Sequence, residues 1–333
     1  MAKDVAPLLP SPMARRLLFT AGALLVYRLG CQIPVPGLST DALLRLNGLL
    51  SVETVSIFAL GVTPFLSALF VFEFIKLIVP PLSRWETAKP ENTRRLSRYV
   101  YFAALVMAGV QARGVASALI EISGLIDGPE WEIPITITFV AGTILLGWFG
   151  ERITARGLGN GFWLLVITPT LINLPIAAAG SFELLRMGSV SQNAFAAGYL
   201  FLAVATALVV VTAVTGRATT ESRVSGADFA IVWPPLLATT IAAFVAPFFA
   251  LQAGGAAHLI LIAVLIAAFT WLQSLGTSQQ ALRPIWIVAV VQILICAGGE
   301  WLTSQISLPF NGSWLIVVVT TMMSLLRSKD AAA

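Results

Sequence analysis

Few residues of this 333-residue chain could perform chemistry, and they are not spaced for it. The one histidine, His258, begins an apolar run without a nearby carboxylate or cysteine, so it offers neither a metal cluster nor a general base. The two cysteines, Cys31 and Cys296, lie in separate apolar segments without CxxC spacing, which predicts two core residues. We therefore expect a protein that is not an enzyme and that holds no metal and no cofactor.

Two further sequence patterns could indicate a binding or proton-transfer site, and both are better explained by structural roles. The segment "RGLGNG" at 156–161 has closely spaced glycines but neither the GxGxxG pattern nor a P-loop lysine, so it predicts a tight turn on the inner side of a membrane, not a phosphate cradle. Glu73 and Lys76 lie three residues apart on one helical face, which favours mutual pairing or snorkelling over a proton relay. The apolar runs carry no spaced series of acids, although an ion-driven transporter would be expected to have one.

The composition is that of an integral membrane protein. Hydrophobic residues make up 58% of the chain and charged residues 11%, and the mean hydropathy is +0.89. A membrane span needs about 20 apolar residues, so the length leaves room for about ten. The basic residues form short clusters between apolar runs and lack interleaved aromatics, which favours a role in membrane orientation and argues against nucleic-acid binding.

The elements that must position any site are therefore spanning helices. The apolar runs predict ten of them, at 15–33, 55–80, 97–120, 133–151, 160–180, 194–215, 229–251, 257–276, 284–302 and 312–327. The first run follows Arg15 and Arg16, as in a signal peptide, but Arg28 interrupts it and no small-residue cleavage site follows. We read it as the first span.

The charge distribution predicts the orientation. If the N-terminus is cytosolic, the outer segments hold two basic residues, Arg45 and Arg186, against fifteen in the inner segments. The fifteen are Lys3, Arg15, Arg16, Arg84, Lys89, Arg94, Arg95, Arg98, Arg152, Arg156, Arg217, Arg223, Arg283, Arg327 and Lys329. Because cytosolic loops carry the excess of Lys and Arg, both termini are expected in the cytosol.

A short internal repeat divides the chain. "GVTPFLSAL" at 61–69 and "IVWPPLLAT" at 231–239 share Pro64 with Pro234 and Leu66 with Leu236 at a constant offset of 170. This offset pairs the second span with the seventh and predicts two five-helix halves, residues 1–180 and 181–333. Internal symmetry of this kind is typical of membrane transport folds.

Five segments resemble the SecY family, the channel subunit of the bacterial protein translocase. They are "RRLLFTAGALLVYRLGCQIPVPG" (15–37), "SIFALGVTPFLSA" (56–68), "NTRRLSRY" (92–99), "GERITARGLGNG" (150–161) and "GSWLIVVV" (312–319). The resemblance implies an all-α membrane protein of about ten helices, arranged as a two-halved clamshell around a hydrophobic constriction. Such a channel opens across the membrane for secreted chains and sideways for membrane segments. The implied location is the bacterial cytoplasmic membrane, with several passes.

The resemblance also assigns a pore ring, residue by residue. Its members here would be Val62, Leu66, Phe162, Val166, Leu236 and Ile316. All six are apolar and bulky, as a ring must be if it is to repel ions by dewetting and still deform around a passing peptide. The break at Gly61 and Pro64 would place apolar side chains in this constriction.

Departures from the family pattern predict a reduced task. The segment 38–55, where the family has a plug helix, is short, so any plug is a stub. The inner loops at 216–228 and 277–284 are also short, and we therefore expect no stable docking of SecA or of ribosomes. The remaining implied partners are substrate polypeptides, small SecE-like and SecG-like membrane subunits, and membrane lipids.

The leading hypothesis is thus a protein-conducting channel or insertase that acts through a hydrophobic ring and a lateral gate. The alternative is a small-molecule or lipid-linked-substrate transporter that reuses the fold. Polar residues converging on the pore would distinguish the second from the first, and the six ring positions offer none.

Overall fold

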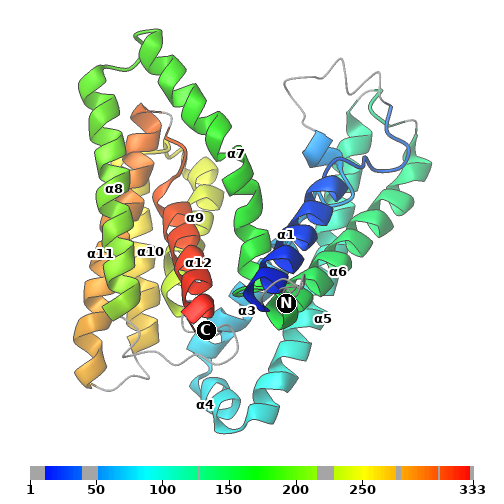
Figure 1. The fold of residues 1–333 in the computed structure, drawn as a ribbon, viewed down its shortest axis with the longest axis horizontal. Helices are drawn as coiled ribbons and strands as arrows, with labels where there is room; N and C mark the ends of the chain where they lie inside the picture. The colour runs from blue at the N-terminus through cyan, green and yellow to red at the C-terminus, as the bar shows by residue number, and fades with distance from the viewer. Residues whose placement is uncertain are drawn as a thin grey trace, which may run out of the picture. The chain divides into compact units, whose positions relative to one another are not determined.

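The computed structural model describes residues 12–39, 52–122, 124–126, 128–215, 229–274, 279–306 and 308–330. In these ranges the chain forms helices and two isolated bridges, Pro34 with Ser56 and Leu38 with Ile126, and it forms no β-strand (Figure 1). The helices are α1 (Pro12–Gly30), η1 (Val52–Val55), α3 (Thr63–Ile78), α4 (Pro80–Ala88), α5 (Pro90–Glu121), η2 (Pro129–Trp131), α6 (Glu132–Arg156), α7 (Gly161–Arg186), α8 (Gln192–Thr215), α9 (Phe229–Val245), η4 (Ala246–Phe249), α10 (Ala256–Ser274), α11 (Gln279–Gln305) and α12 (Gly312–Asp330).

Seven segments within the described ranges are long and apolar enough to cross a membrane. They are Pro90–Glu121, Pro129–Arg156, Gly161–Arg186, Gln192–Val214, Val232–Phe249, Ala256–Ser274 and Ile285–Gln305, and Gly312–Leu326 is a shorter apolar helix. Large apolar side chains such as Phe102, Ile137 and Leu200 are exposed along these helices. Water would penalise such surfaces, whereas lipid does not. The predicted all-α, multi-pass membrane fold is confirmed.

The second predicted span, 55–80, is wrong at its start. The helix begins only at Thr63, because Ile57–Val62 forms successive turns. Gly61 adopts a left-handed backbone (φ 56°), and its N–H donates to the Phe58 carbonyl at 2.8 Å. Pro64 then falls in the first turn of α3, where its missing N–H costs no helical hydrogen bond.

Contacts divide the chain into two compact units. The first holds residues up to Phe72, Arg95–Thr168 and residues from Leu325, and the second holds Glu73–Arg94 and Pro169–Ser324. The predicted halves, 1–180 and 181–333, follow the order of the spans and stay a prediction.

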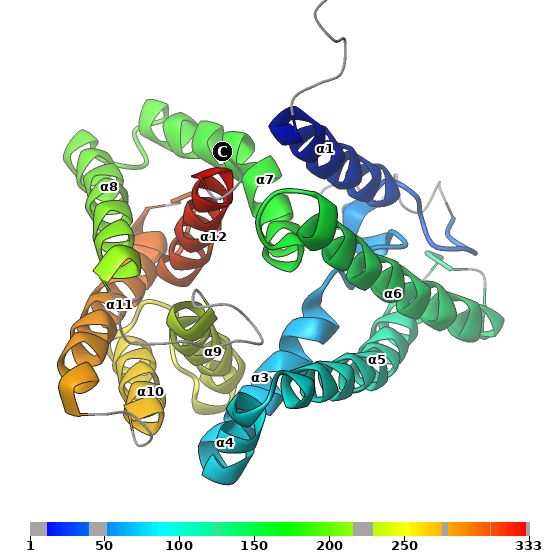
Figure 2. The same ribbon diagram turned by 60° about the horizontal axis from the view of Figure 1, so that its bottom comes forward.

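In the first unit, α5 and α6 lie side by side (Figures 1 and 2). A row of alanines at every fourth residue of α5, including Ala112 and Ala116, is fully buried and allows close packing. Against it lie Ile135 and Phe139 of α6 and Leu60 of the turn segment, all in one core cluster. This packing holds the turns before α3 against two long helices.

The second unit contains α8, α9, α10 and α11, of which α10 packs on both α9 and α11 (Figure 2). Both cysteines are buried as predicted, Cys296 in this unit and Cys31 in the first. His258 is also buried, in the first turn of α10. Of the short segments named above, residues 40–51 of the plug region, the whole loop 216–228 and residues 277–278 lie outside the described residues.

Candidate pore constriction

The turn segment Ser56–Val62 is not helical, but backbone hydrogen bonds join its start to the residues that follow α1. The Ile57 N–H donates to the Ile33 carbonyl at 2.9 Å, and the Val35 N–H donates to the Val55 carbonyl at 2.9 Å. The Ser56 side chain is fully buried and donates to the Glu53 carbonyl at 2.9 Å. Irregular backbone is tolerated at membrane depth only where protein satisfies it in this way.

Glycines on two helices make room for this segment. A Cβ atom on Gly142 of α6 would lie 2.1 Å from the Ile57 carbonyl oxygen, and one on Gly30 of α1 would lie 2.0 Å from the Phe58 ring. The turns therefore fill space that any side chain at those positions would occupy. As a result, the direction in which α3 leaves the segment is fixed. Val62 ends the segment and Leu66 lies in the first turn of α3, where its N–H donates to the Val62 carbonyl at 3.1 Å.

The predicted tight turn at 156–161 is confirmed, and it anchors α7. The Leu158 N–H donates to Thr20 Oγ1 of α1 at 3.0 Å, and the Gly161 N–H donates to Thr154 Oγ1 of α6 at 2.9 Å. Asn160 caps the helix, because its Oδ1 accepts from the Phe162 N–H at 3.0 Å. The start of α7 is thus held by both α1 and α6.

Within the first unit, the structure brings the starts of α3 and α7 together. Phe162 is half-buried and meets Phe65 edge to face, with ring centroids 6.4 Å apart. Both rings belong to a core cluster with Ala68, Val100 and Ala104. Of the predicted ring residues in this unit, Val62 and Val166 are buried and Leu66 and Phe162 are half-buried.

The second unit carries the other two predicted ring residues. Leu236 lies on α9, and its backbone carbonyl accepts from Thr240 Oγ1 at 2.7 Å and from Thr239 Oγ1 at 3.1 Å. Pro234 lies inside α9, unlike Pro64 in the first turn of α3, so the repeated prolines sit in different backbone settings. Ile316 is buried on α12, where its carbonyl accepts from the Thr320 hydroxyl.

The chain contains a second internal repeat, besides that of 61–69 with 231–239. "NGFWLLV" at 160–166 and "NGSWLIV" at 311–317 are identical at five of seven positions, at an offset of 151. This repeat pairs the start of α7 with the start of α12, the fifth and tenth predicted spans. It aligns Val166 with Val317 and Leu165 with Ile316.

The repeated residues do the same work in each unit. Asn311 caps α12, because its Oδ1 accepts from the Trp314 N–H at 3.2 Å, as Asn160 caps α7. A Cβ atom on Gly312 would lie 2.1 Å from the Ile295 carbonyl oxygen of α11, and one on Gly161 would lie 2.3 Å from the Gly150 carbonyl oxygen of α6. In both places an Asn-Gly pair lets a helix begin in contact with the backbone of the preceding helix.

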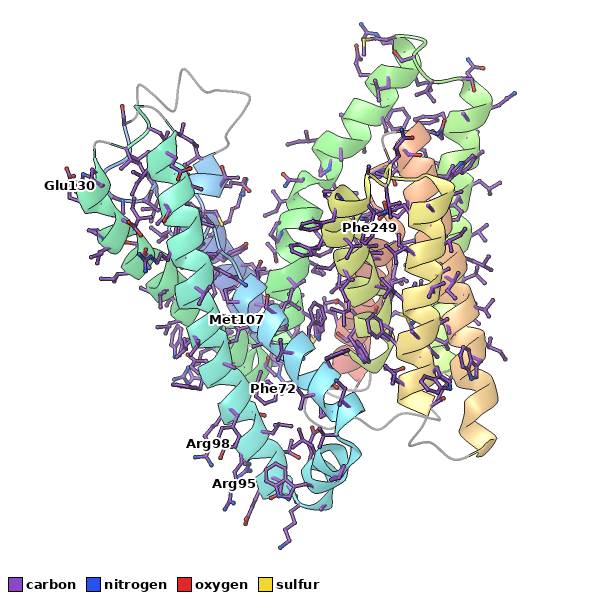
Figure 3. All side chains as sticks on the ribbon, turned by 180° about the vertical axis from the view of Figure 1, so that it is seen from behind. Phe72, Arg95, Arg98, Met107, Glu130 and Phe249 are labelled. Carbon is purple, nitrogen blue, oxygen red and sulfur yellow. The ribbon has the colours of Figure 1, made fainter. Side chains whose placement is uncertain are left out.

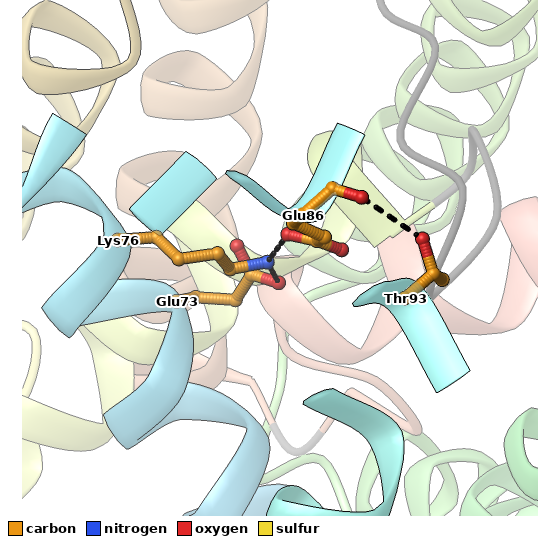
Figure 4. Close-up of polar contacts among 4 residues, drawn as sticks. All are labelled: Glu73, Lys76, Glu86 and Thr93. Carbon is orange, nitrogen blue, oxygen red and sulfur yellow. Dashed lines mark hydrogen bonds and ion pairs between the residues drawn. The ribbon is translucent and has the colours of Figure 1, made fainter. Parts of the chain in front are cut away.

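The predicted pairing of Glu73 with Lys76 is confirmed, and a third residue joins it (Figure 4). Lys76 Nζ donates to Glu73 Oε1 at 2.5 Å and to Glu86 Oε2 at 3.1 Å. The three side chains are 9%, 16% and 6% exposed in the order Lys76, Glu73 and Glu86. Thr93 Oγ1 donates to the Glu86 carbonyl at 3.1 Å. This charged cluster ties α4 to α3 and to the start of α5.

Arg28 and Arg113, which fall within the predicted spans 15–33 and 97–120, are paired as well. Arg28 bonds Glu53, which ties the end of α1 to η1. Arg113 Nε donates to Glu132 Oε1 at 3.1 Å, which ties α5 to α6. Each of these charges thus has a structural partner, as charges at membrane depth usually do.

Comparison with known proteins gives consistent matches. The SecY family model matches residues 56–296. The SecY subunit of the protein translocase of Escherichia coli K12 is 34% identical over 197 residues, which cover 53% of this chain and 44% of that protein. The SecY subunit of Pseudomonas aeruginosa is 36% identical over 199 residues, covering 54% and 44%. The chain spans about half the length of the curated relatives it matches.

Solved structures match along the whole chain. A SecY structure concerned with the plug domain and the closed channel has a TM-score of 0.61 and 15% identity, and the match covers 100% of this chain and 96% of that one. Sec61 in the canine ribosome-channel complex has a TM-score of 0.61 and 13% identity over the same shares. At these identities the likeness is one of fold.

Proposed function

This chain belongs to the SecY family, and on that premise we propose that it is a protein-conducting channel or insertase of the bacterial cytoplasmic membrane. The observation that carries the proposal is the non-helical segment Ser56–Val62, which ends where α3 begins. Backbone hydrogen bonds hold this segment, and it packs against glycines of α1 and α6. A break that is held by backbone hydrogen bonds and packed against glycines of two helices is suited to hold one position. It would hold Val62 and Leu66 at the constriction.

The proposed mechanism is gating by a ring of apolar side chains. Val62, Leu66, Phe162, Val166, Leu236 and Ile316 form the constriction in this proposal. A closed apolar ring is costly to hydrate, so ions do not pass, whereas an extended peptide can displace the side chains without being bound. The protein acts by opening and closing, and no bond is made or broken.

The capped starts of α7 and α12 support the assignment of two related halves. Because a half with five spans begins and ends on opposite sides, two successive halves cross the membrane in opposite directions. The two Asn-Gly anchors would then lie on opposite sides, Asn160 in the cytosol and Asn311 outside. Both termini would be cytosolic.

The proposed partners are substrate polypeptides and small SecE-like and SecG-like subunits. A stable complex with SecA or ribosomes is not expected, because the loops 216–228 and 277–284 offer little basic surface. Co-sedimentation at physiological ionic strength tests this point. The substrates would then be short hydrophobic segments or a narrow set of exported chains.

A small-molecule or lipid-linked-substrate transporter that reuses the fold is the weaker candidate. It requires charged or polar groups that bind and release a substrate, yet Arg28, Lys76 and Arg113 each pair with a carboxylate in a structural role.

The experiment that tests the proposed function is an insertion assay. Vesicles containing only this chain and its copurified small subunits receive a short radiolabelled membrane protein, and protease protection is measured. Protection above that of empty vesicles is expected. Equal protection with and without the chain would contradict the proposal.

A further inference from the structure

A groove of about 650 Å³ runs between α5 and α6 of the first unit, outside the proposed constriction. Its walls come from residues 97–101 of α5 and residues 141–151 of α6, including Arg98, Tyr101, Leu145 and Trp148. Figure 3 shows Arg95 and Arg98 near one end of α5, with Met107 farther along the helix. The volume is in the usual range for sites that hold small organic ligands.

The polarity of the groove changes along its length. Ala141, Ile144 and Leu145 line one end, and Arg98 and Glu151 line the other. Ten residues of α6 separate Ala141 from Glu151, which corresponds to about 15 Å of helix. The groove is therefore an apolar slot with a charged mouth, the profile of a ligand with a hydrocarbon tail and a polar head.

Aromatic residues mark the level at which this change occurs. Trp148 and Tyr101 both line the groove near its charged end. Trp and Tyr collect at the boundary between hydrocarbon and headgroups, where one part of the ring is apolar and another is polar. The charged mouth would thus lie at the depth of lipid headgroups, and Ile144 would lie at the depth of acyl chains.

Arg98 and Glu151 line the mouth itself, and further arginines lie close to it in the sequence. Residues 94–101 and 145–156 contain five arginines and one acid, Glu151. Arg152 packs over the Trp148 ring with its guanidinium carbon 5.2 Å from the ring centroid, so it is held beside the groove. One guanidinium group can donate two parallel hydrogen bonds to two oxygens of a phosphate, so arginine is the preferred side chain for binding phosphate.

We propose that this groove binds one anionic phospholipid, and the proposal does not depend on the channel function. The acyl chain would lie along Ile144 and Leu145, and the phosphate would contact Arg98 and Arg152. Glu151 would accept a hydrogen bond from a headgroup hydroxyl, which favours a glycerol headgroup over choline. A second protein helix is the alternative occupant, and the crosslinking arm below distinguishes it from a lipid.

The test is native mass spectrometry of the purified full chain with phosphatidylglycerol and with phosphatidylcholine. Phosphatidylglycerol should bind at least about tenfold more tightly, and the double variant R98Q/R152Q should lose that preference. The matched control is R186Q, because Arg186 is an exposed arginine at the far end of α7. It should keep the preference, and far-UV circular dichroism should show that each variant is folded.

Two further measurements test the binding of the acyl chain separately from the binding of the headgroup. L145W should fill the slot and weaken lipid binding, whereas V106W, at an exposed position of α5 outside the groove, should not. Inorganic phosphate should not compete, because it lacks the tail. Equal binding of both lipids, unchanged binding by R98Q/R152Q, or competition by free phosphate would overturn the proposal. A photo-crosslinker at position 145 that captures only protein in native membranes would overturn it as well.

Discussion

Gly161 at the start of α7 lies so close to Gly150 of α6 that a Cβ atom on Gly161 would be 2.3 Å from the Gly150 carbonyl oxygen. The same relationship joins Gly312 at the start of α12 to the carbonyl oxygen of Ile295, at 2.1 Å. Both contacts involve backbone, which cannot move aside as a side chain can. The glycine of each Asn-Gly pair is therefore not expected to tolerate replacement by a residue with a side chain.

Replacing Gly161 or Gly312 by alanine should lower the free energy of unfolding by about 1–3 kcal/mol, because the added methyl group overpacks a backbone contact. Unfolding in detergent micelles by titrated dodecyl sulfate measures this. Gly180, in the same helix as Gly161, has no atom within 4 Å of its would-be Cβ. G180A should be neutral or slightly stabilising, since alanine favours helix. Equal losses in G180A and G161A would contradict the contact argument.

Removing the cation from the charged cluster should destabilise the protein more than removing a surface charge. K76M leaves Glu73 and Glu86 buried without their partner, at an expected cost of about 3 kcal/mol. The triple variant E73Q/K76M/E86Q should recover most of this loss, because no uncompensated charge remains. R186M, which breaks an exposed pair with Glu183, should change stability by less than about 0.5 kcal/mol. A K76M loss no larger than that of R186M would show that the cluster is not structural.

The sequence predicted some of these features and missed others for physical reasons. Hydropathy alone gave the spans, because lipid requires long apolar runs. It could not show that Ser56–Val62 is not helical, since that depends on backbone bonds to Ile33 and on the missing side chain at Gly142, both distant in sequence. The contact of Glu86 with Lys76 was missed because these residues lie on different helices.

The Asn-Gly anchors could have been found. The repeat of 160–166 at 311–317 is visible in the sequence, although its two copies differ at the third and sixth positions. What no sequence pattern could reveal is that both glycines lie against the backbone of the preceding helix.

The proposed ring predicts that polar substitutions raise ion leakage. L66N and L236N should each raise the conductance of the resting protein in planar bilayers severalfold, because asparagine hydrates the constriction. V71N, at an exposed position of α3, should leave conductance unchanged. Unchanged conductance in both L66N and L236N would remove these residues from the seal.

The charge distribution predicts the topology. Reporter fusions after Lys329 and within 216–228 should both report a cytosolic location, because the basic residues collect on that side. A fusion within 121–132, a loop expected outside, is the matched control. An external location for either of the first two would contradict the ten-span order.

The most direct test of the central claim is photo-crosslinking from the ring during insertion. Crosslinkers placed at positions 66 and 236 should capture a radiolabelled polypeptide arrested in transit. The same crosslinker at positions 137 and 264, exposed on α6 and α10, should capture mainly lipid. Polypeptide adducts at 66 and 236 alone are the predicted result. Adducts of equal yield at all four positions, or none at 66 and 236, would contradict a peptide path through this ring.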